Sequence, residues 1–206
     1  MKRRGDPVTA STRKRGGVTK RRKSEPTAIF QLKITLAEIE PPIWRRVLVP
    51  AEIRLGKLHD VLQAAMGWTN SHLHQFTILD RRFSDPRFDD DGELEFEDER
   101  KVPLDRLVGA GQTLSYEYDF GDSWEHEVLV EEIREPESRM SYPVCIAGAR
   151  ACPPEDAGGV PGYARLLESI ADPEDPEHDE FLTWLGGVFD PEGFDLNLTN
   201  RALRWG

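Results

Sequence analysis

Two carboxylates and an imidazole lie within eight residues of one another in the second half of the sequence. Asp119 and Asp122 flank Phe120-Gly121, and His126 follows four residues after Asp122. These side chains can supply oxygen and nitrogen ligands to a divalent metal ion, or act as acid and base in proton transfer. We therefore take all three as candidate catalytic residues and as candidate metal ligands. In the alternative interpretation, the carboxylates fix a turn by accepting backbone N–H bonds, and His126 lies beside the core.

Four further titratable residues are candidates for the same site. Glu155 and Asp156 follow two prolines and precede Gly158-Gly159, so they belong to a loop. They could act as additional ligands or as a general base, or could bond only to the local backbone. His72 and His74 are two residues apart, which on a strand places both on one face, a spacing that suits one metal. The alternative for these histidines is half-buried packing with local partners.

Aromatic residues accompany these polar groups along the chain. We expect Trp44, Trp68, Tyr118 and Trp124, together with His72 and His74, to be partner-binding or ligand-binding candidates. The simpler alternative is that the aromatic rings are part of the core or its rim.

The two cysteines, Cys145 and Cys152, are too few for a disulfide framework, and buried free thiols are the favoured interpretation. Several common enzyme signatures are absent from the sequence. It contains no phosphate-binding glycine-rich loop, no Gly-x-Ser-x-Gly motif, no His-Glu-x-x-His pair and no four-ligand zinc pattern. The corresponding enzyme classes are therefore disfavoured.

The elements that must position the candidate residues follow from hydrophobic periodicity. Alternation predicts strands at residues 29–39, 43–49, 72–79, 113–120 and 124–133. Helical spacing predicts a helix at residues 55–66, closed by Gly67, and two shorter helices at 163–170 and 177–185. Residues 80–101 are expected to form a solvated loop that could contain a short hairpin, and residues 104–108 a short helical piece.

This order predicts an α+β fold with a mixed, mainly antiparallel curved sheet, built as ββαβ and then a ββ hairpin, flanked by helices. We expect a single domain at residues 28–206 behind a basic, disordered tail at residues 1–27. The tail holds almost no apolar side chains.

Charge is divided unevenly between the predicted tail and the predicted body. Residues 1–26 carry a net charge of +8, which leaves −19 for the rest of a chain whose total is −11. The tail could therefore bind nucleic acid, whereas the body would repel phosphates and is expected to bind a protein partner. The chain has no apolar run long enough to span a bilayer and no signal peptide, so we expect a cytoplasmic protein that does not bind membranes.

Several unusual strings resemble, in order and spacing, the plasmid ORF-3-like family, also labelled insertion-element passenger proteins of TnpR type. The strings are Pro41-Pro42-Ile43-Trp44-Arg45-Arg46, Leu58-His59-Asp60, Met66-Gly67-Trp68, His72-Leu73-His74-Gln75-Phe76, residues 116–126 and residues 152–159. The resemblance implies a protein carried by mobile genetic elements. It departs at Ala157, where the family pattern often has a third cysteine.

Three functions follow from these observations. The first is an accessory or interaction module associated with mobile elements, with an acidic body and a basic tail. The second is a metal-dependent hydrolase or nuclease that uses the carboxylate and histidine pocket with a divalent metal. The third is a DNA recombination accessory, as the family label suggests, which the negative charge of the body disfavours.

Overall fold

The structure is a computed structural model, and it describes residues 26–88 and 95–205. The predicted basic tail lies almost entirely outside the described residues, as does the centre of the acidic loop at residues 89–92. The disorder of the tail and its binding to nucleic acid therefore stay predictions, as does the single-domain boundary at residue 28.

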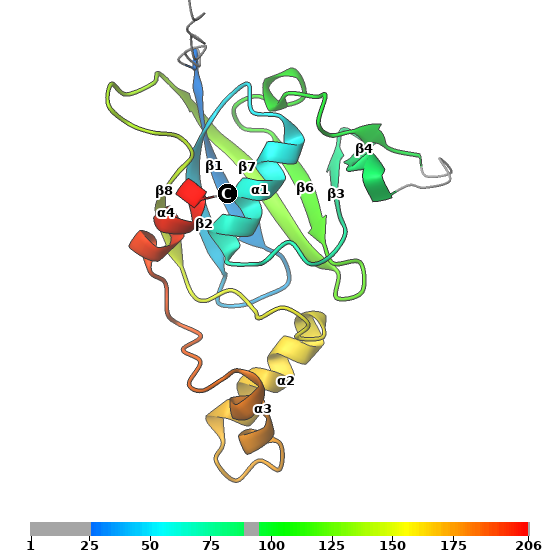
Figure 1. The fold of residues 1–206 in the computed structure, drawn as a ribbon, viewed down its shortest axis with the longest axis vertical. Coiled ribbons are helices and arrows are strands. Elements are labelled where there is room, and N and C mark those ends of the chain that lie inside the picture. Colours follow the sequence, from blue (N-terminus) through cyan, green and yellow to red (C-terminus); the bar gives the residue numbers. More distant parts are fainter. Residues whose placement is uncertain (1–25, 89–94, 206) are drawn as a thin grey trace, which may run out of the picture.

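Eight strands form one open sheet in the order β5-β4-β3-β6-β7-β1-β2-β8 (Figure 1). Neighbouring strands pair antiparallel except β4 and β5, which are parallel. This arrangement confirms the predicted α+β class. The strands are β1 (Ile29–Leu36), β2 (Trp44–Pro50), β3 (His74–Ile78), β4 (Arg81–Ser84), β5 (Glu97–Asp98), β6 (Thr113–Tyr118), β7 (Trp124–Arg134) and β8 (Val144–Ala149).

The described residues also form four α-helices and two short 3-10 turns. The helices are α1 (Leu55–Met66), α2 (Gly159–Ala171), α3 (His178–Trp184) and α4 (Leu196–Trp205), and the 3-10 turns are Pro86–Phe88 and Leu104–Arg106. None of these helices has the length and apolar character that a bilayer span requires.

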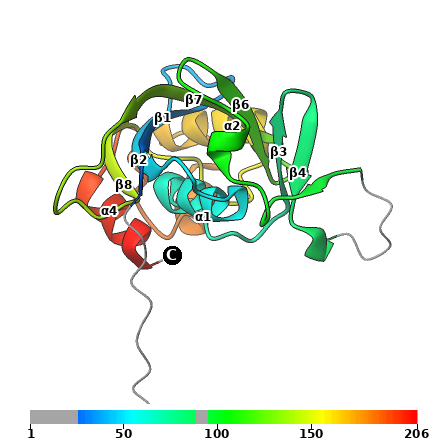
Figure 2. The same cartoon turned by 90° about the horizontal axis from the view of Figure 1, so that it is seen from above.

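The core lies between α1 and the sheet that curves around it (Figure 2). Leu55, Leu58 and Leu62 recur at helical spacing and are fully buried, and they face a sheet whose alternate residues Leu32 and Ile34 are also fully buried. Burying a side chain of this size stabilises the fold by about 1.5–3 kcal/mol. The helical spacing in α1 and the alternation in β1 therefore place apolar side chains on the two sides of one interface.

Two tight backbone turns direct the chain toward one end of the sheet. Gly67 ends α1 with φ 98°, and its N–H donates to the carbonyl oxygen of Gln63 at 2.8 Å. Asp119 begins the β6–β7 turn with φ 58°, a left-handed conformation that aspartate tolerates better than most residues. The segments after α1 and after β6 therefore lie at the same end of the sheet.

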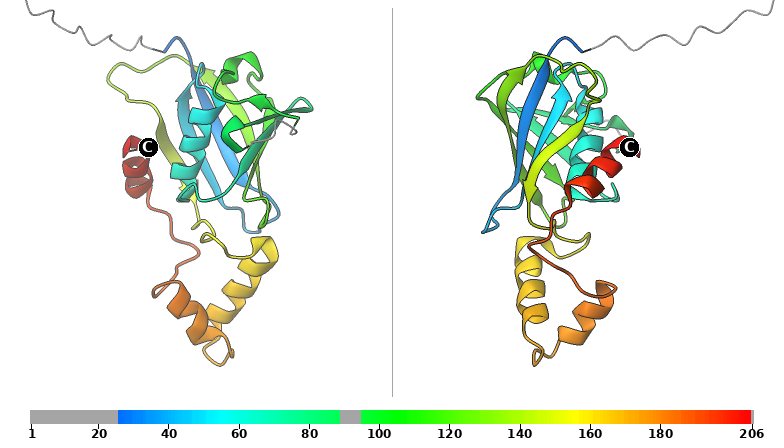
Figure 3. Two further views of the ribbon diagram at one scale, coloured as in Figure 1. Left: turned by 45° about the vertical axis from the view of Figure 1, so that its right-hand side comes forward. Right: turned by 90° about the vertical axis from the view of Figure 1, so that its left-hand side faces the viewer.

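The predicted strands, α1, α2 and α3 are present, but α2 and α3 do not cover a face of the sheet. They pack on each other and extend beyond its lower end (Figure 3). The face that α1 leaves open beside β8 is instead covered by α4, which contacts both elements.

The predicted strands and helices did not include β4, β5, β8 or α4. The strand β8 contains alanine and glycine rather than an alternating apolar pattern, and it is specified by pairing with β2. The helix α4 had a readable start signal, because Asp195 Oδ1 accepts the N–H groups of Asn197 and Leu198 at 2.8 and 3.0 Å. The acidic segment at 80–101 was also more structured than predicted, since Phe83 of β4 is fully buried.

Candidate metal centre

Three segments that are distant in the sequence bring their side chains together at one end of the sheet. His72 precedes β3, Asp119 follows β6, and Asp156 lies in the loop between β8 and α2. One ligand atom from each of these residues lies within 4.8 Å of the other two. This spacing allows all three to contact one metal ion.

The imidazole of His72 stands at the centre of the group. Its Nε2 lies 3.1 Å from Asp156 Oδ1, 3.6 Å from Asp119 Oδ2 and 3.9 Å from Glu155 Oε2. The nitrogen is enclosed, yet it makes no hydrogen bond with acceptable geometry within the described chain. Because a buried polar atom without a partner is costly, this nitrogen suits a ligand that it can bind directly.

The β6–β7 turn orients Asp119 toward His72. One carboxylate oxygen, Oδ1, accepts the N–H of Gly121 at 3.0 Å, which leaves Oδ2 facing the imidazole. The backbone N–H of Asp119 donates to the carbonyl oxygen of Leu73, so the turn is also tied to the segment that carries His72. The carboxylate is therefore held in position by its own turn.

Glu155 is fixed at the rim of the cluster by three donors. Thr69 donates from its N–H at 2.7 Å and from its hydroxyl at 3.0 Å, and the Tyr118 hydroxyl lies 3.1 Å from the same oxygen, Oε1. Burial raises the pKa of Tyr118 to about 12, so its phenol keeps its proton and can donate. Oε2 is the oxygen of Glu155 that lies near His72.

Asp122 holds the loop that carries Glu155 and Asp156. Its Oδ2 accepts the N–H of Gly158 at 2.9 Å, across from the β6–β7 turn. A Cβ atom at Gly159 would lie only 2.5 Å from the carbonyl oxygen of Asp122. Asp122 therefore lies beside the cluster and positions the loop. Its carboxylate is not one of the three ligands that the cluster groups together.

The structure places His126 away from the cluster. It is 1% exposed on β7, its Nδ1 lies 3.1 Å from the carbonyl oxygen of Tyr116, and its ring meets the edge of Trp68. Burial lowers its pKa to about 4, so the imidazole is neutral at pH 7. Its position corresponds to the alternative interpretation in which His126 lies beside the core.

His74 is the first residue of β3 and is not one of the three grouped ligands. The His74 ring stacks on His59 with centroids 3.5 Å apart, and its Nε2 lies 2.8 Å from Glu99 Oε2. His59 in turn bonds the Tyr116 hydroxyl and the Asn70 side chain at 2.8 Å each. These residues form a buried polar network between α1 and the sheet.

The aromatic candidates occupy two different environments. Trp68, Tyr118 and Trp124 are buried behind the cluster, and the Trp68 ring lies 4.9 Å from that of Tyr118. Trp44 is on β2 at the sheet surface, where the Arg46 guanidinium stacks on it at 5.1 Å. Trp44 therefore takes no part in the cluster.

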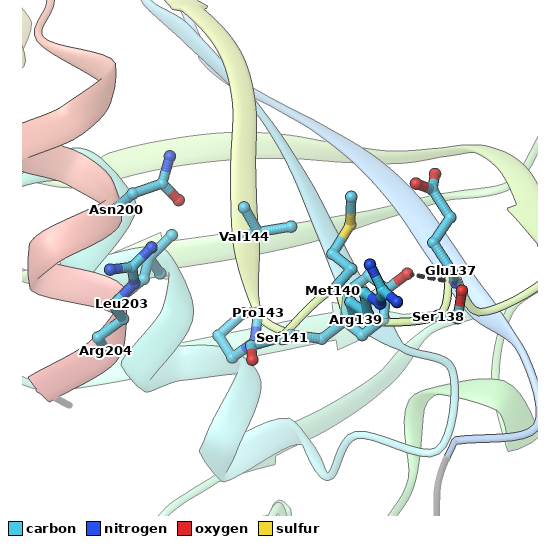
Figure 4. A pocket seen from close by; sticks show the side chains of 11 residues that line it. Glu137, Ser138, Arg139, Met140, Ser141, Pro143, Val144, Asn200, Leu203 and Arg204 are labelled. Carbon is cyan, nitrogen blue, oxygen red and sulfur yellow. Dashed lines mark hydrogen bonds between the residues drawn. The ribbon is translucent and has the colours of Figure 1, made fainter.

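Two cavities border elements discussed above. A cleft of about 460 Å³ adjoins the cluster and shares Glu155 with it. A larger cavity of about 850 Å³ lies between the β7–β8 loop and α4, where Met140, Val144 and Asn200 are among the side chains around it (Figure 4). Its described lining residues contain neither histidine nor cysteine, so it offers no metal-binding group comparable to the cluster.

The sequence left two positions open for His59, reaching the sheet face or capping its edge, and the bond to the Tyr116 hydroxyl of β6 shows that it reaches the sheet. The role of Glu99 was missed, because Glu99 lies in the segment assigned to a solvated loop. Glu99 Oε1 would lie 3.1 Å from a Cβ atom added at Gly56. This contact is visible only in the folded chain, so the glycine was not a usable signal in the sequence.

Comparison with known proteins gives a consistent result. The family model described as plasmid pRiA4b ORF-3-like protein matches residues 28–198. The chain is 41% identical to the uncharacterized protein y4hQ of Sinorhizobium fredii over 180 residues, which cover 85% of this chain and 91% of that protein. It is similar to the crystal structure of a protein of unknown function, MM3350, from Methanosarcina mazei Go1. The TM-score is 0.77 and the identity 34%, covering 85% of this chain and 98% of that one.

Proposed function

Because the chain belongs to the plasmid pRiA4b ORF-3-like family, whose matched relatives carry no stated activity, we propose a function from the site itself: a divalent-metal centre that supports hydrolysis. The ligands are His72, Asp119 and Asp156. The single observation that carries this proposal is the enclosed His72 Nε2, which faces carboxylate oxygens of both aspartates without making a hydrogen bond.

The donor set fits a divalent cation that accepts mixed nitrogen and oxygen ligands. One imidazole and two carboxylates leave coordination positions free for water and substrate, as in catalytic sites that have three protein ligands. The side chain of Asp156 is 71% exposed, which leaves the centre open to solvent on that side. An ion bound there would make a bound water more acidic and polarise a substrate oxygen.

Neighbouring residues have supporting roles in this proposal. Tyr118 and Thr69 fix Glu155, whose Oε2 is the closest further carboxylate oxygen to His72 and can accept a proton from water. Asp122 holds the loop against the β6–β7 turn through Gly158. His74 and His126 each have one ring nitrogen bonded elsewhere, His74 Nε2 to Glu99 and His126 Nδ1 to the carbonyl oxygen of Tyr116, and this proposal gives neither a catalytic role.

The proposal is tested by metal binding to an Asp119→Asn variant. Asparagine keeps Oδ1 as the acceptor for Gly121 and tolerates the left-handed backbone, so the turn should persist while the anionic ligand is lost. Calorimetric titration with Mn²⁺ or Zn²⁺ should show at least tenfold weaker binding than in the wild-type protein.

The matched control is Glu127→Gln, which removes one exposed carboxylate from β7. Metal affinity in this variant should equal that of the wild type, because the change alters net charge by the same amount without touching the cluster. Equal affinity in all three proteins, or no metal binding by the wild type, would count against the metal centre.

A second candidate function is partner binding, which exposed apolar side chains near the C-terminal helices favour. Val188 is 96% exposed and Leu198 58% exposed. Exposed apolar side chains mark an interaction surface where they form one contiguous patch. The first partner to test is a second copy of this chain. Sedimentation velocity should show concentration-dependent association that a Val188→Asp, Leu198→Asp double variant loses. A wild-type protein that stays monomeric at high concentration would argue against self-association.

We also propose that the protein works in the cytoplasm, as the sequence suggested. Cys145 and Cys152 are both free, and Cys145 is buried on β8. Free thiols are usual in a reducing compartment. Fractionation of cells that express the tagged chain should recover it in the cytoplasmic fraction.

A further inference from the structure

The cleft beside the metal cluster is lined by the end of α1, by the loop between β8 and α2, and by the end of α3 and the residues after it. Its volume is about 460 Å³, within the range of small-molecule sites. The lining residues are Met66, Gly67, Trp68, Cys152, Pro153, Pro154, Glu155, Trp184, Leu185 and Phe189. Glu155 belongs to both the cleft and the rim of the cluster, so an occupant of the cleft lies next to the proposed metal.

Most of the side chains that line the cleft are apolar, whereas polar atoms make up about half of its exposed surface. Trp68 Nε1 donates to the carbonyl oxygen of Pro153 at 3.0 Å. Burial raises the pKa of the Cys152 thiol well above its usual range, so it remains uncharged. Among the described lining residues, Glu155 alone carries a charge. An uncharged, apolar group therefore fits the cleft best.

Trp184 supplies an aromatic surface that is still available to a ligand. Its side chain is 47% exposed although it lines the cleft, whereas Trp68, which also lines the cleft, is 7% exposed. A large apolar side chain that bound in the cleft against Trp184 would bury aromatic surface, which is favourable at about 25 cal/mol per Å².

The negative charge of the neighbouring cluster restricts which chemical group of a substrate can react there. Asp119, Glu155 and Asp156 together outweigh one divalent cation, so the centre stays negative after metal binding. A phosphate group would be repelled, whereas a neutral carbonyl would not. The nuclease reaction is therefore disfavoured relative to hydrolysis of an acyl compound.

We infer that the cleft binds the apolar side chain of an uncharged amide or ester substrate and presents its carbonyl to the His72–Asp119–Asp156 cluster. This inference rests on the proposed metal centre. In the reaction, water adds to the carbonyl carbon, the C–N or C–O bond breaks, and the proton released by water is transferred to the leaving nitrogen or oxygen. The products are a carboxylic acid and an amine or alcohol, and no oxidant or reductant is needed.

Binding by the cleft can be measured without metal. We expect the EDTA-treated full-length protein to bind N-acetyl-L-phenylalaninamide in calorimetry or ligand-observed NMR, and Trp184→Ala to weaken this binding at least tenfold. The matched control is Phe88→Ala, because Phe88 is an aromatic residue with the same 47% exposure that does not line the cleft. Its affinity should equal that of the wild type.

Three outcomes would overturn the inference: no binding of the amide at millimolar concentration, equal binding by Trp184→Ala, or equal binding of the acidic analogue N-acetyl-L-aspartic acid amide. Asp119→Asn separates this inference from the proposed metal centre. It should bind the phenylalanine amide normally, but its Mn²⁺-treated form should not release ammonia and N-acetylphenylalanine, as the wild type should. Amide binding without metal binding in the wild type would refute the metal centre and leave cleft binding established.

Discussion

The side chains of Glu99 and His74 form a buried polar pair that joins the segment after β5 to β3. Both side chains are 3% exposed, and the contacting atoms are 2.8 Å apart. Glu99 Oε1 also lies against Gly56 at the start of α1, where a negative charge is favoured by the helix dipole. The pair therefore connects the segment after β5 to β3, beside the start of α1.

Replacing Glu99 with glutamine should destabilise the protein by about 1–3 kcal/mol, because the amide weakens a buried hydrogen bond between the Glu99 carboxylate and the His74 ring. Urea denaturation monitored by circular dichroism measures the change. The control is Glu97→Gln, which breaks an exposed bidentate pair with Arg81 and should cost much less stability than Glu99→Gln. Equal costs for the two variants would refute the structural role of Glu99.

At the scale of elements, the position of the loop that carries Asp156 depends on a close approach between Gly159 and the β6–β7 turn. Gly159 has φ 67°, and a Cβ atom there would be 2.5 Å from the carbonyl oxygen of Asp122. Both atoms belong to the backbone, so the contact cannot be relieved by rotating a side chain. The start of α2 is therefore one of the parts that fix the geometry of the candidate centre.

Gly159→Ala should weaken metal binding at least tenfold even though it removes no ligand, because it forces the loop away from Asp119. Gly111→Ala is the control. It imposes a comparable left-handed backbone strain at φ 79°, but no atom lies within 4 Å of the added Cβ. Calorimetric titration with Mn²⁺ should give the wild-type affinity for this control, and a matching loss in both variants would mean that strain alone is responsible.

For the whole molecule, two buried histidines make stability depend on pH. Burial lowers the pKa of His59 and of His126 to about 4, and for His59 the adjacent His74 adds to the effect. In the unfolded chain their pKa is near 6.5, so the unfolded state binds more protons between these values. Stability is therefore complete above pH 6.5 and falls as the pH approaches 4.

We expect acidification from pH 6.5 to 4 to remove roughly 3 kcal/mol for each of these histidines. Urea denaturation at half-unit pH intervals measures the loss. A His126→Gln variant should be less stable at pH 7 and should show a smaller decrease through the same window. A wild-type unfolding free energy that does not change between pH 6.5 and 4 would contradict this assignment.

Elements that are specified by interactions between residues close in the sequence were predicted correctly. Elements that are specified by pairing with distant segments were missed. The bounds of α1 and its cap at Gly67 were read correctly, because the apolar stripe and the glycine are local signals. The hairpins β1–β2 and β6–β7 were also read correctly from alternation and turn residues. In contrast, β8 was missed because its pairing with β2 specifies it more than its own residues do.

The candidate site also combines features that local sequence specifies with features that only the fold specifies. The sequence identified Asp119, Glu155, Asp156 and His72 as residues able to bind a metal, because residue type and turn context are local properties. It could not decide that His72 Nε2 would face Asp119 and Asp156, while His74, two residues later, would pair with Glu99. That choice depends on where β3 begins, which is set by its pairing with β6.

The sequence by itself determined the α+β class, the principal hairpins, the helix α1 and the chemical types available to a site. Short-range forces specify these features, since hydrophobic periodicity, capping and turn propensity act over a few residues. The tertiary structure decided which of those side chains meet, which are buried with other partners, and that an apolar cleft lies beside Glu155. These outcomes depend on packing between segments more than 80 residues apart, such as the contact of Thr69 with Glu155, where the sequence separation is 86.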